Sequence, residues 1–228
     1  MFENKTPQTG TYPKTGIEAT FFGKVMTFFA LAILASAAGT FITYNYFIEV
    51  FIQNPSLIYL FFIAELAIIF TARKWREKRP LNRIMFAAFA FITGITLAPL
   101  IGVLINTPGG VAILTKALLA TGLTFTGTAL IGWTTKVNLS GLRGFLMMGL
   151  LGMIIVGIIG IFVPWGNTFE LVFSGAGVLL FCGFTMYDFQ KIKEFPEDGY
   201  IDAALMLYLD IFNLFLFLLR FITALSRE

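Results

Sequence analysis

The 228-residue chain contains no histidine and a single cysteine, Cys182. Without histidine there is no Ser–His or Cys–His catalytic pair and no imidazole ligand for a metal. A lone cysteine forms no disulfide within the chain, and we interpret Cys182 as a small packing residue. Any metal site must therefore use oxygen ligands, which favours calcium, magnesium or manganese over zinc or copper.

Charge is also scarce, since charged residues make up 13% of the chain and hydrophobic residues make up 57%. A soluble domain usually carries about 25% charged residues. The composition therefore predicts an integral membrane protein whose main partner is the lipid bilayer. The net charge of +3 gives no indication that the protein binds nucleic acid.

Seven apolar stretches each approach the length of about 20 residues that a helix needs to cross a bilayer. Short segments with turn signals, such as Asn54-Pro55, separate these stretches. The predicted spans are residues 24–46, 56–75, 82–105, 111–134, 142–163, 169–189 and 201–225. We predict an all-α, multi-span membrane protein, with seven helices in residues 24–225 and an N-terminal tail in residues 1–23.

Lysine and arginine predict how the chain is oriented, because cytoplasmic loops are enriched in both. If the N-terminus is cytoplasmic, only Lys116, Arg220 and Arg227 of the 16 basic residues lie outside. We therefore expect the N-terminus in the cytoplasm and the C-terminus outside.

The carboxyl groups of Asp188, Asp210 and Glu65 lie in or at the end of predicted spans, where an isolated charge costs about 2.5–3.5 kcal/mol on insertion scales. Asp188 ends the sixth span, and Asp210 lies about 14 Å into the seventh. Glu65 lies in the second span. Arg76 follows it by about three helical turns and is expected to share its face. We expect carboxylates at this depth to serve ions, protons or chemistry.

The seventh span carries a polar stripe that includes Asp202, Asp210, Asn213 and Arg220 within an arc of about 80°. A helix with such a stripe should lie in the middle of the bundle or against a water-filled cavity. Asp202 and Asn213 are therefore candidates for an ion path.

Two carboxyl groups that lie close together cannot both ionise freely, so Asp188 and Asp210 are expected to titrate as a coupled unit. Their oxygens are also suitable ligands for Ca²⁺, while Arg76 would compete for the same carboxylates. The residues predict a proton-sensitive site for a hard cation.

Several motifs resemble a known family. Residues 187–190 read Tyr-Asp-Phe-Gln, and residues 207–215 read Leu-Tyr-Leu-Asp-Ile-Phe-Asn-Leu-Phe before Leu218-Leu219-Arg220. Together they resemble the signature of the transmembrane Bax-inhibitor-motif family. Residues 93–99, Thr-Gly-Ile-Thr-Leu-Ala-Pro, are similar to the family's Gly-x-Thr-Leu-Ser-Pro element, with Ala98 in place of the more usual serine.

The resemblance implies a fold in which the seventh helix is surrounded by the other six, and a pH-sensitive Ca²⁺ leak rather than an enzyme. It implies that Asp188 and Asp210 form the proton-sensing pair and ligate Ca²⁺, with no resident cofactor. It also implies that Arg76 engages the pair, with Arg73 as a competing candidate, and that Glu65 lies on the ion path. Because the chain lacks a lysine-rich C-terminal tail, it looks like a bacterial member, which suggests the plasma membrane.

Three alternatives stay open at this point. The first is a cation/proton exchanger. The second is an intramembrane aspartyl protease, since Tyr187-Asp188 fits the first half of that motif, although residues 207–210 lack the glycines of Gly-x-Gly-Asp. The third is a regulatory protein that binds other membrane proteins without transport.

Overall fold

The computed structural model describes residues 15–164 and 166–227, and all regular structure within them is helical. The α-helices are α1 (Thr15–Ile42), α2 (Ile48–Gln53), α3 (Leu57–Phe70), α4 (Ala72–Trp75), α5 (Leu81–Ile105), α6 (Gly110–Thr134), α7 (Leu142–Phe162), α8 (Asn167–Lys191) and α9 (Tyr200–Leu225). A π-helical segment, η1 (Thr43–Phe47), joins α1 to α2. Short 3₁₀ segments, η2 (Leu139–Gly141) and η3 (Ile192–Glu194), precede α7 and follow α8.

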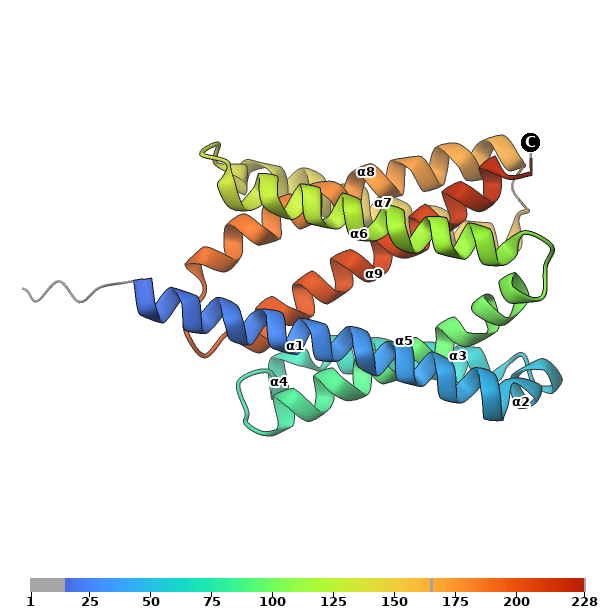
Figure 1. Ribbon diagram of the computed structural model, residues 1–228, viewed down its shortest axis with the longest axis horizontal. Coiled ribbons are helices and arrows are strands. Elements are labelled where there is room, and N and C mark those ends of the chain that lie inside the picture. The colour runs from blue at the N-terminus through green and yellow to red at the C-terminus, as the bar shows by residue number, and fades with distance from the viewer. Residues whose placement is uncertain (1–14, 165, 228) are drawn as a thin grey trace, which may run out of the picture.

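The helices form an elongated bundle in which α9 runs obliquely between two groups (Figure 1). Helices α6, α7 and α8 lie on one side of α9, and α1, α3, α4 and α5 lie on the other. Helix α9 packs against α8, α6, α1 and α5. Its buried side chains, among them Leu207 and Leu214, belong to the hydrophobic core that joins the two groups.

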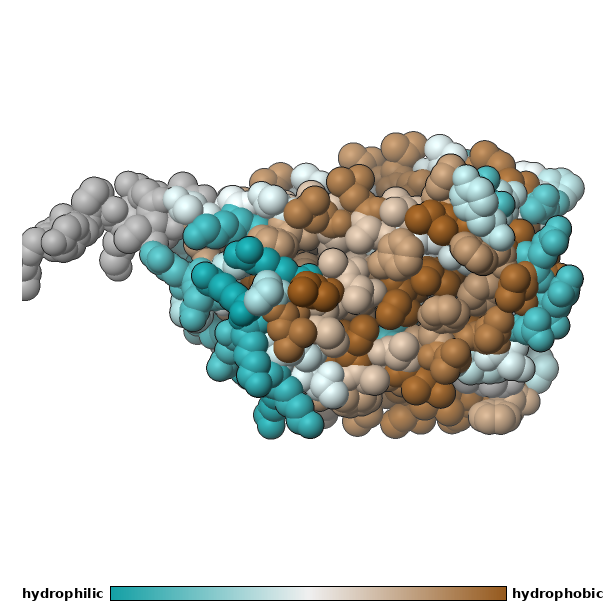
Figure 2. All heavy atoms as spheres, turned by 90° about the horizontal axis from the view of Figure 1, so that it is seen from below, coloured by the Kyte–Doolittle hydropathy of each residue, from teal (hydrophilic) through white to brown (hydrophobic). Residues whose placement is uncertain are grey.

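The outer surface has the hydropathy of a membrane protein. Figure 2 shows a broad apolar band with hydrophilic residues gathered at both ends of the bundle. Six helical stretches are long and apolar enough to cross a bilayer: Thr20–Gln53, Leu81–Ile105, Gly110–Thr134, Leu139–Gly160, Asn167–Glu194 and Tyr200–Leu225. The chain is therefore a multi-span membrane protein, as its composition predicts.

The first span is longer than predicted. The helix begins at Thr15, within the range predicted to be the tail, and continues through η1 and α2 to Gln53 instead of ending at residue 46. Within this stretch the chain has no proline, and the first one after it, Pro55, follows directly on Asn54. Because a proline disfavours helical backbone in the preceding residue, the helix ends there.

The second predicted span, residues 56–75, is interrupted. Helix α3 ends at Phe70, where the Thr71 hydroxyl donates to the Ala67 carbonyl at 2.6 Å, and α4 resumes at Ala72. The 14 residues of α3 extend about 21 Å, less than the roughly 30 Å of a bilayer core. Together, α3 and α4 still return the chain from the α2 end of the bundle to the other end (Figure 1).

Two glycines allow neighbouring helices to approach so closely that their backbones are in contact. A Cβ on Gly94 of α5 would lie 2.0 Å from the Ser36 carbonyl oxygen of α1. A Cβ on Gly132 of α6 would lie 2.3 Å from the Met186 carbonyl oxygen of α8. In lipid, where apolar side chains gain little by associating, such small-residue contacts are a main source of helix packing.

Candidate functional site

Helices α8 and α9 bring Asp188 and Asp210 together in the interior of the bundle. Their exposed fractions are 5% and 4%, and the two carboxyl groups lie close enough to interact electrostatically. Asp210 Oδ2 is fully buried and has no hydrogen-bond partner among the described residues. A buried acceptor without a donor costs about 1–3 kcal/mol, so the pair is a place where a proton or a cation would be stabilised.

The sequence context explains why these side chains point inward. Tyr187 and Phe189 flank Asp188 and are buried, and Leu207 and Tyr208 precede Asp210 on the buried side of α9. These apolar groups hold both carboxyls away from solvent. The Asp pair, Asp188 and Asp210, is therefore dry and flanked mainly by apolar side chains.

The positive charge that acts on Asp188 comes from Arg143, at the start of α7. Sequence reasoning used Arg143 only to orient the chain. The loop before Arg143 is anchored by Gln190, whose Oε1 accepts from Leu139 N and whose Nε2 donates to Val137 O, both at 2.8 Å. The Tyr-Asp-Phe-Gln motif thus contains both a member of the Asp pair and the residue that anchors the loop before Arg143.

Arg76 lies beside a different carboxylate from the one predicted. Its Nε is 3.8 Å from Asp202 Oδ2 and 3.7 Å from Glu77 Oε1. The expectation that Arg76 shares a helical face with Glu65 is wrong, because it needs one continuous helix and the helix is interrupted at Thr71. Two predicted site residues, Arg76 and Asp202, are nevertheless neighbours.

Glu65 points toward α5, where Thr96 Oγ1 donates to Glu65 Oε1 at 2.8 Å. Asn213 donates to the Leu209 carbonyl of its own helix at 2.7 Å. The predicted site residues thus fall into separate places: the Asp pair, the Arg76–Asp202 contact, the Glu65–Thr96 contact and Asn213.

A polar contact between α9 and α1 was missed by sequence reasoning. The hydroxyl groups of Tyr208 and Ser36 are 2.7 Å apart, and Ser36 Oγ also donates to the Ala90 carbonyl at 2.8 Å. This contact ties α9 to α1 and α5 two residues before Asp210. A serine within an apolar run gives little sequence signal, because its partners lie on other helices.

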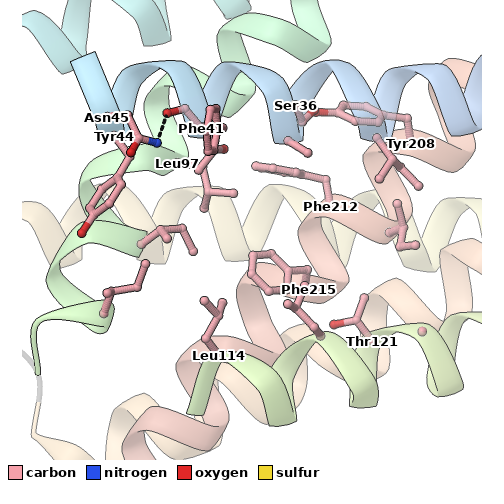
Figure 3. A pocket seen from close by; sticks show the side chains of 18 residues that line it. Ser36, Phe41, Tyr44, Asn45, Leu97, Leu114, Thr121, Tyr208, Phe212 and Phe215 are labelled. Carbon is pink, nitrogen blue, oxygen red and sulfur yellow. Dashed lines mark hydrogen bonds between the residues drawn. The ribbon is translucent and has the colours of Figure 1, made fainter. Parts of the chain in front are cut away.

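Ser36 and Tyr208 also line a cavity of about 490 Å³ between α1, α5, α6 and α9. Figure 3 shows Phe212 and Phe215 of α9 projecting into it between Ser36 on α1 and Thr121 on α6. Most lining side chains are apolar, and Asp188, Asp210 and Glu65 are not among them. The cavity therefore contains none of these three carboxyl groups.

The described residues hold no group of three or more His, Cys, Asp or Glu side chains arranged to bind a metal. Ca²⁺ takes six to eight oxygen ligands in stable protein sites. Two aspartates alone cannot complete such a shell. Any cation at the pair would retain most of its ligands as water.

The motifs and the fold agree with comparisons against known proteins. Residues 18–227 match the family described as inhibitor of apoptosis-promoting Bax1. Lifeguard 4 of mouse is 30% identical over 217 residues, which cover 93% of this chain and 88% of that protein. The Golgi anti-apoptotic protein of vaccinia virus is 33% identical with the same coverage, and an uncharacterised protein of Campylobacter jejuni is 26% identical over 91% of this chain and 90% of its own. The chain therefore belongs to the Bax inhibitor family.

Proposed function

We propose that this protein is a pH-sensitive Ca²⁺ leak, gated by a proton shared between Asp188 and Asp210. The observation that carries the proposal is the contact between these two buried carboxyl groups. Two carboxyl groups form a hydrogen bond only when one of them holds a proton. Loss of that proton replaces an attraction between α8 and α9 with repulsion of like charges.

The absence of histidine strengthens the assignment of pH sensing to the Asp pair. Histidine is the side chain whose ordinary titration falls between about pH 5 and 8. Because this chain has none, a response near neutral pH has to come from groups whose surroundings alter their titration. The dry setting and the contact of the Asp pair supply such surroundings.

Ca²⁺ is the proposed cargo rather than a resident metal. Carboxylate oxygens suit this hard cation, and the small number of protein ligands favours brief passage over storage. Glu65, Asp202 and Asn213 are proposed to line the route. Arg76, which contacts Asp202 in this structure, is proposed to reach the pair in another state of the gate.

The proposed topology has seven spans, with the N-terminus in the cytoplasm, the C-terminus outside and α9 enclosed by the other helices. The return of α3 and α4 along the bundle supports the seventh crossing (Figure 1). The basic residues of the α4–α5 region support the orientation. Relatives in Campylobacter jejuni and Helicobacter pylori support a bacterial plasma membrane.

A second candidate is an exchanger that moves Ca²⁺ against protons, because a shared proton could be its counter-ion. Purified protein in liposomes, with a Ca²⁺ dye and a pH dye inside, separates the two functions. The leak predicts Ca²⁺ entry at constant internal pH once the membrane potential is clamped. Proton efflux in fixed proportion to Ca²⁺ entry would instead establish the exchanger.

Two further functions have weaker support. The name of the vaccinia virus relative, a Golgi anti-apoptotic protein, favours a regulatory role without transport. Protein-containing liposomes that take up no more Ca²⁺ than empty ones would support that role. An aspartyl protease needs room for a substrate backbone beside the aspartates, whereas Leu207 is fully buried there.

A further inference from the structure

Three cations from separate segments converge on the ring of Tyr200, the first residue of α9. Arg79 Cζ lies 5.2 Å from the ring centre, and Lys24 Nζ and Arg83 Cζ each lie 5.9 Å from it. Lys24 comes from α1, Arg79 precedes α5, and Arg83 lies in its first turn. We call Lys24, Arg79, Arg83 and Tyr200 the Tyr200 cluster.

The ring is held in place by the cluster itself. Tyr200 is 2% exposed, and its hydroxyl accepts from Arg83 Nη2 at 2.8 Å and from Arg83 Nε at 3.3 Å. The Phe28 ring packs 5.4 Å from the Tyr200 ring and also lies under Arg83. The three cations are exposed, so their outer faces stay open to a ligand.

The positive charge of the cluster is not neutralised within the described part of the chain. None of its three cations is within ion-pair distance of a described carboxylate, whereas nearby Arg76 pairs with Asp202 and Glu77. Lys24 Nζ and the Arg79 guanidinium donate no hydrogen bond to a described acceptor. Like charges gathered around one ring repel, and an anion placed among them would relieve that repulsion.

We propose that the Tyr200 cluster binds a phosphate group of an anionic lipid. Arginine matches phosphate geometry through paired N–H donors, and lysine adds a compact point charge. The cluster lies at the basic end of the bundle, which carries the α4–α5 segment. Figure 2 shows hydrophilic residues at this end, next to the apolar band. This is the level at which lipid headgroups surround a membrane protein.

The excess of basic residues at this end is what the positive-inside rule requires, but that rule asks only for their number. It does not explain why cations from α1, α5 and the segment before α5 meet on one aromatic ring. Lys74 and Lys78 provide the contrast, because they lie in the same basic segment and neither contacts the Tyr200 ring. A site specific to the cluster should depend on Lys24 and Arg79 far more than on this matched pair.

The test measures retention of phosphatidylglycerol by the purified full-length protein with native mass spectrometry, with phosphatidylcholine as the zwitterionic reference. In the Lys24→Gln/Arg79→Gln variant we expect the affinity for phosphatidylglycerol to fall about tenfold or more, since each cation near an anionic lipid contributes severalfold. The Lys74→Gln/Lys78→Gln control should stay within about twofold of the wild type. Equal losses in the two double variants would overturn the proposal, because they would indicate general attraction to the basic end.

Three further measurements identify the source of the phosphate, test the paired donors of Arg79 and guard against misfolding. Inorganic phosphate at millimolar concentration should not displace the lipid; displacement would overturn the lipid assignment in favour of free phosphate. The Arg79→Lys variant keeps the charge but loses the paired donors, so it should retain an intermediate affinity. Thermal unfolding in phosphatidylcholine must be unchanged in every variant, and loss of binding with unchanged unfolding supports the proposal.

Discussion

The hydroxyl of Tyr208 lies 2.7 Å from that of Ser36, so the helix that carries Asp210 is tied to α1 inside the membrane. Ser36 Oγ can also donate to the Ala90 carbonyl of α5 or to the Ala32 carbonyl of its own helix, and these acceptors remain if Tyr208 loses its hydroxyl. The tie therefore joins three helices on the wall of the cavity.

Tyr208→Phe should lower stability without loss of the fold. The change removes one buried hydrogen bond, which is worth about 0.5–1.5 kcal/mol, while the ring keeps its edge contacts with Phe86 and Phe89. The expected readout is a lower thermal unfolding midpoint in detergent. In a double-mutant cycle, Ser36→Ala and Tyr208→Phe should be less than additive, and full additivity would show that the two hydroxyls do not interact.

Gly94→Ala should destabilise the bundle strongly, because the new Cβ would lie 2.0 Å from the Ser36 carbonyl oxygen and α1 would have to move. Thermal unfolding is the measurement, and Gly152→Ala is the matched control. A Cβ on Gly152 meets nothing within 4 Å, and alanine stabilises a helix interior by about 0.5–1 kcal/mol relative to glycine. Similar unfolding midpoints for the two variants would contradict the close approach of α1 and α5.

Glu65→Gln tests whether the Glu65 charge or only its shape matters. Glutamine retains an acceptor for the Thr96 hydroxyl, so the unfolding midpoint should change little. If Glu65 lies on the ion path, Ca²⁺ flux into liposomes should fall severalfold at every pH. Unchanged flux at unchanged stability would remove Glu65 from the path.

Arg76→Gln and Asp202→Asn test the contact at the basic end of the bundle. Both side chains are partly exposed, so their coupling energy should be below about 1 kcal/mol and should shrink as salt is added. If Arg76 also acts on the gate, Arg76→Gln should shift the pH profile of Ca²⁺ flux, whereas Asp202→Asn should mainly change its amplitude. Identical profiles in both variants would leave Arg76 without a gating role.

The sequence predicted the helices well where hydrophobic length and turn signals act together. The last five spans begin and end within two residues of their predicted bounds, since the Pro-Gly-Gly of residues 108–110, Pro164 and similar signals end or start helices locally. The interruption at Thr71 was missed. A threonine that bonds back to the preceding turn is common within helices and does not by itself signal a break.

The residues of the candidate site also divide into those that could be predicted from the sequence and those that could not. Asp188 and Asp210 could be singled out because buried charge is costly wherever it occurs. Arg143, Ser36 and the cations around Tyr200 could not, because their roles depend on which helices become neighbours. The contact of Arg76 with Asp202 could not be predicted for the same reason, and the shared face of Arg76 and Glu65 was predicted on the assumption of an unbroken helix.

The central claim is that the Asp pair senses protons, and Ca²⁺ flux against pH in liposomes tests it most directly. The wild type, Asp188→Asn and Asp210→Asn should be compared with Glu49→Gln, which removes an exposed carboxyl of α2 outside the pair. We predict that the flux through the wild type and through Glu49→Gln changes steeply near neutral pH, and that both aspartate variants lose this change. An aspartate variant that folds, conducts Ca²⁺ and keeps the wild-type pH profile would contradict the account.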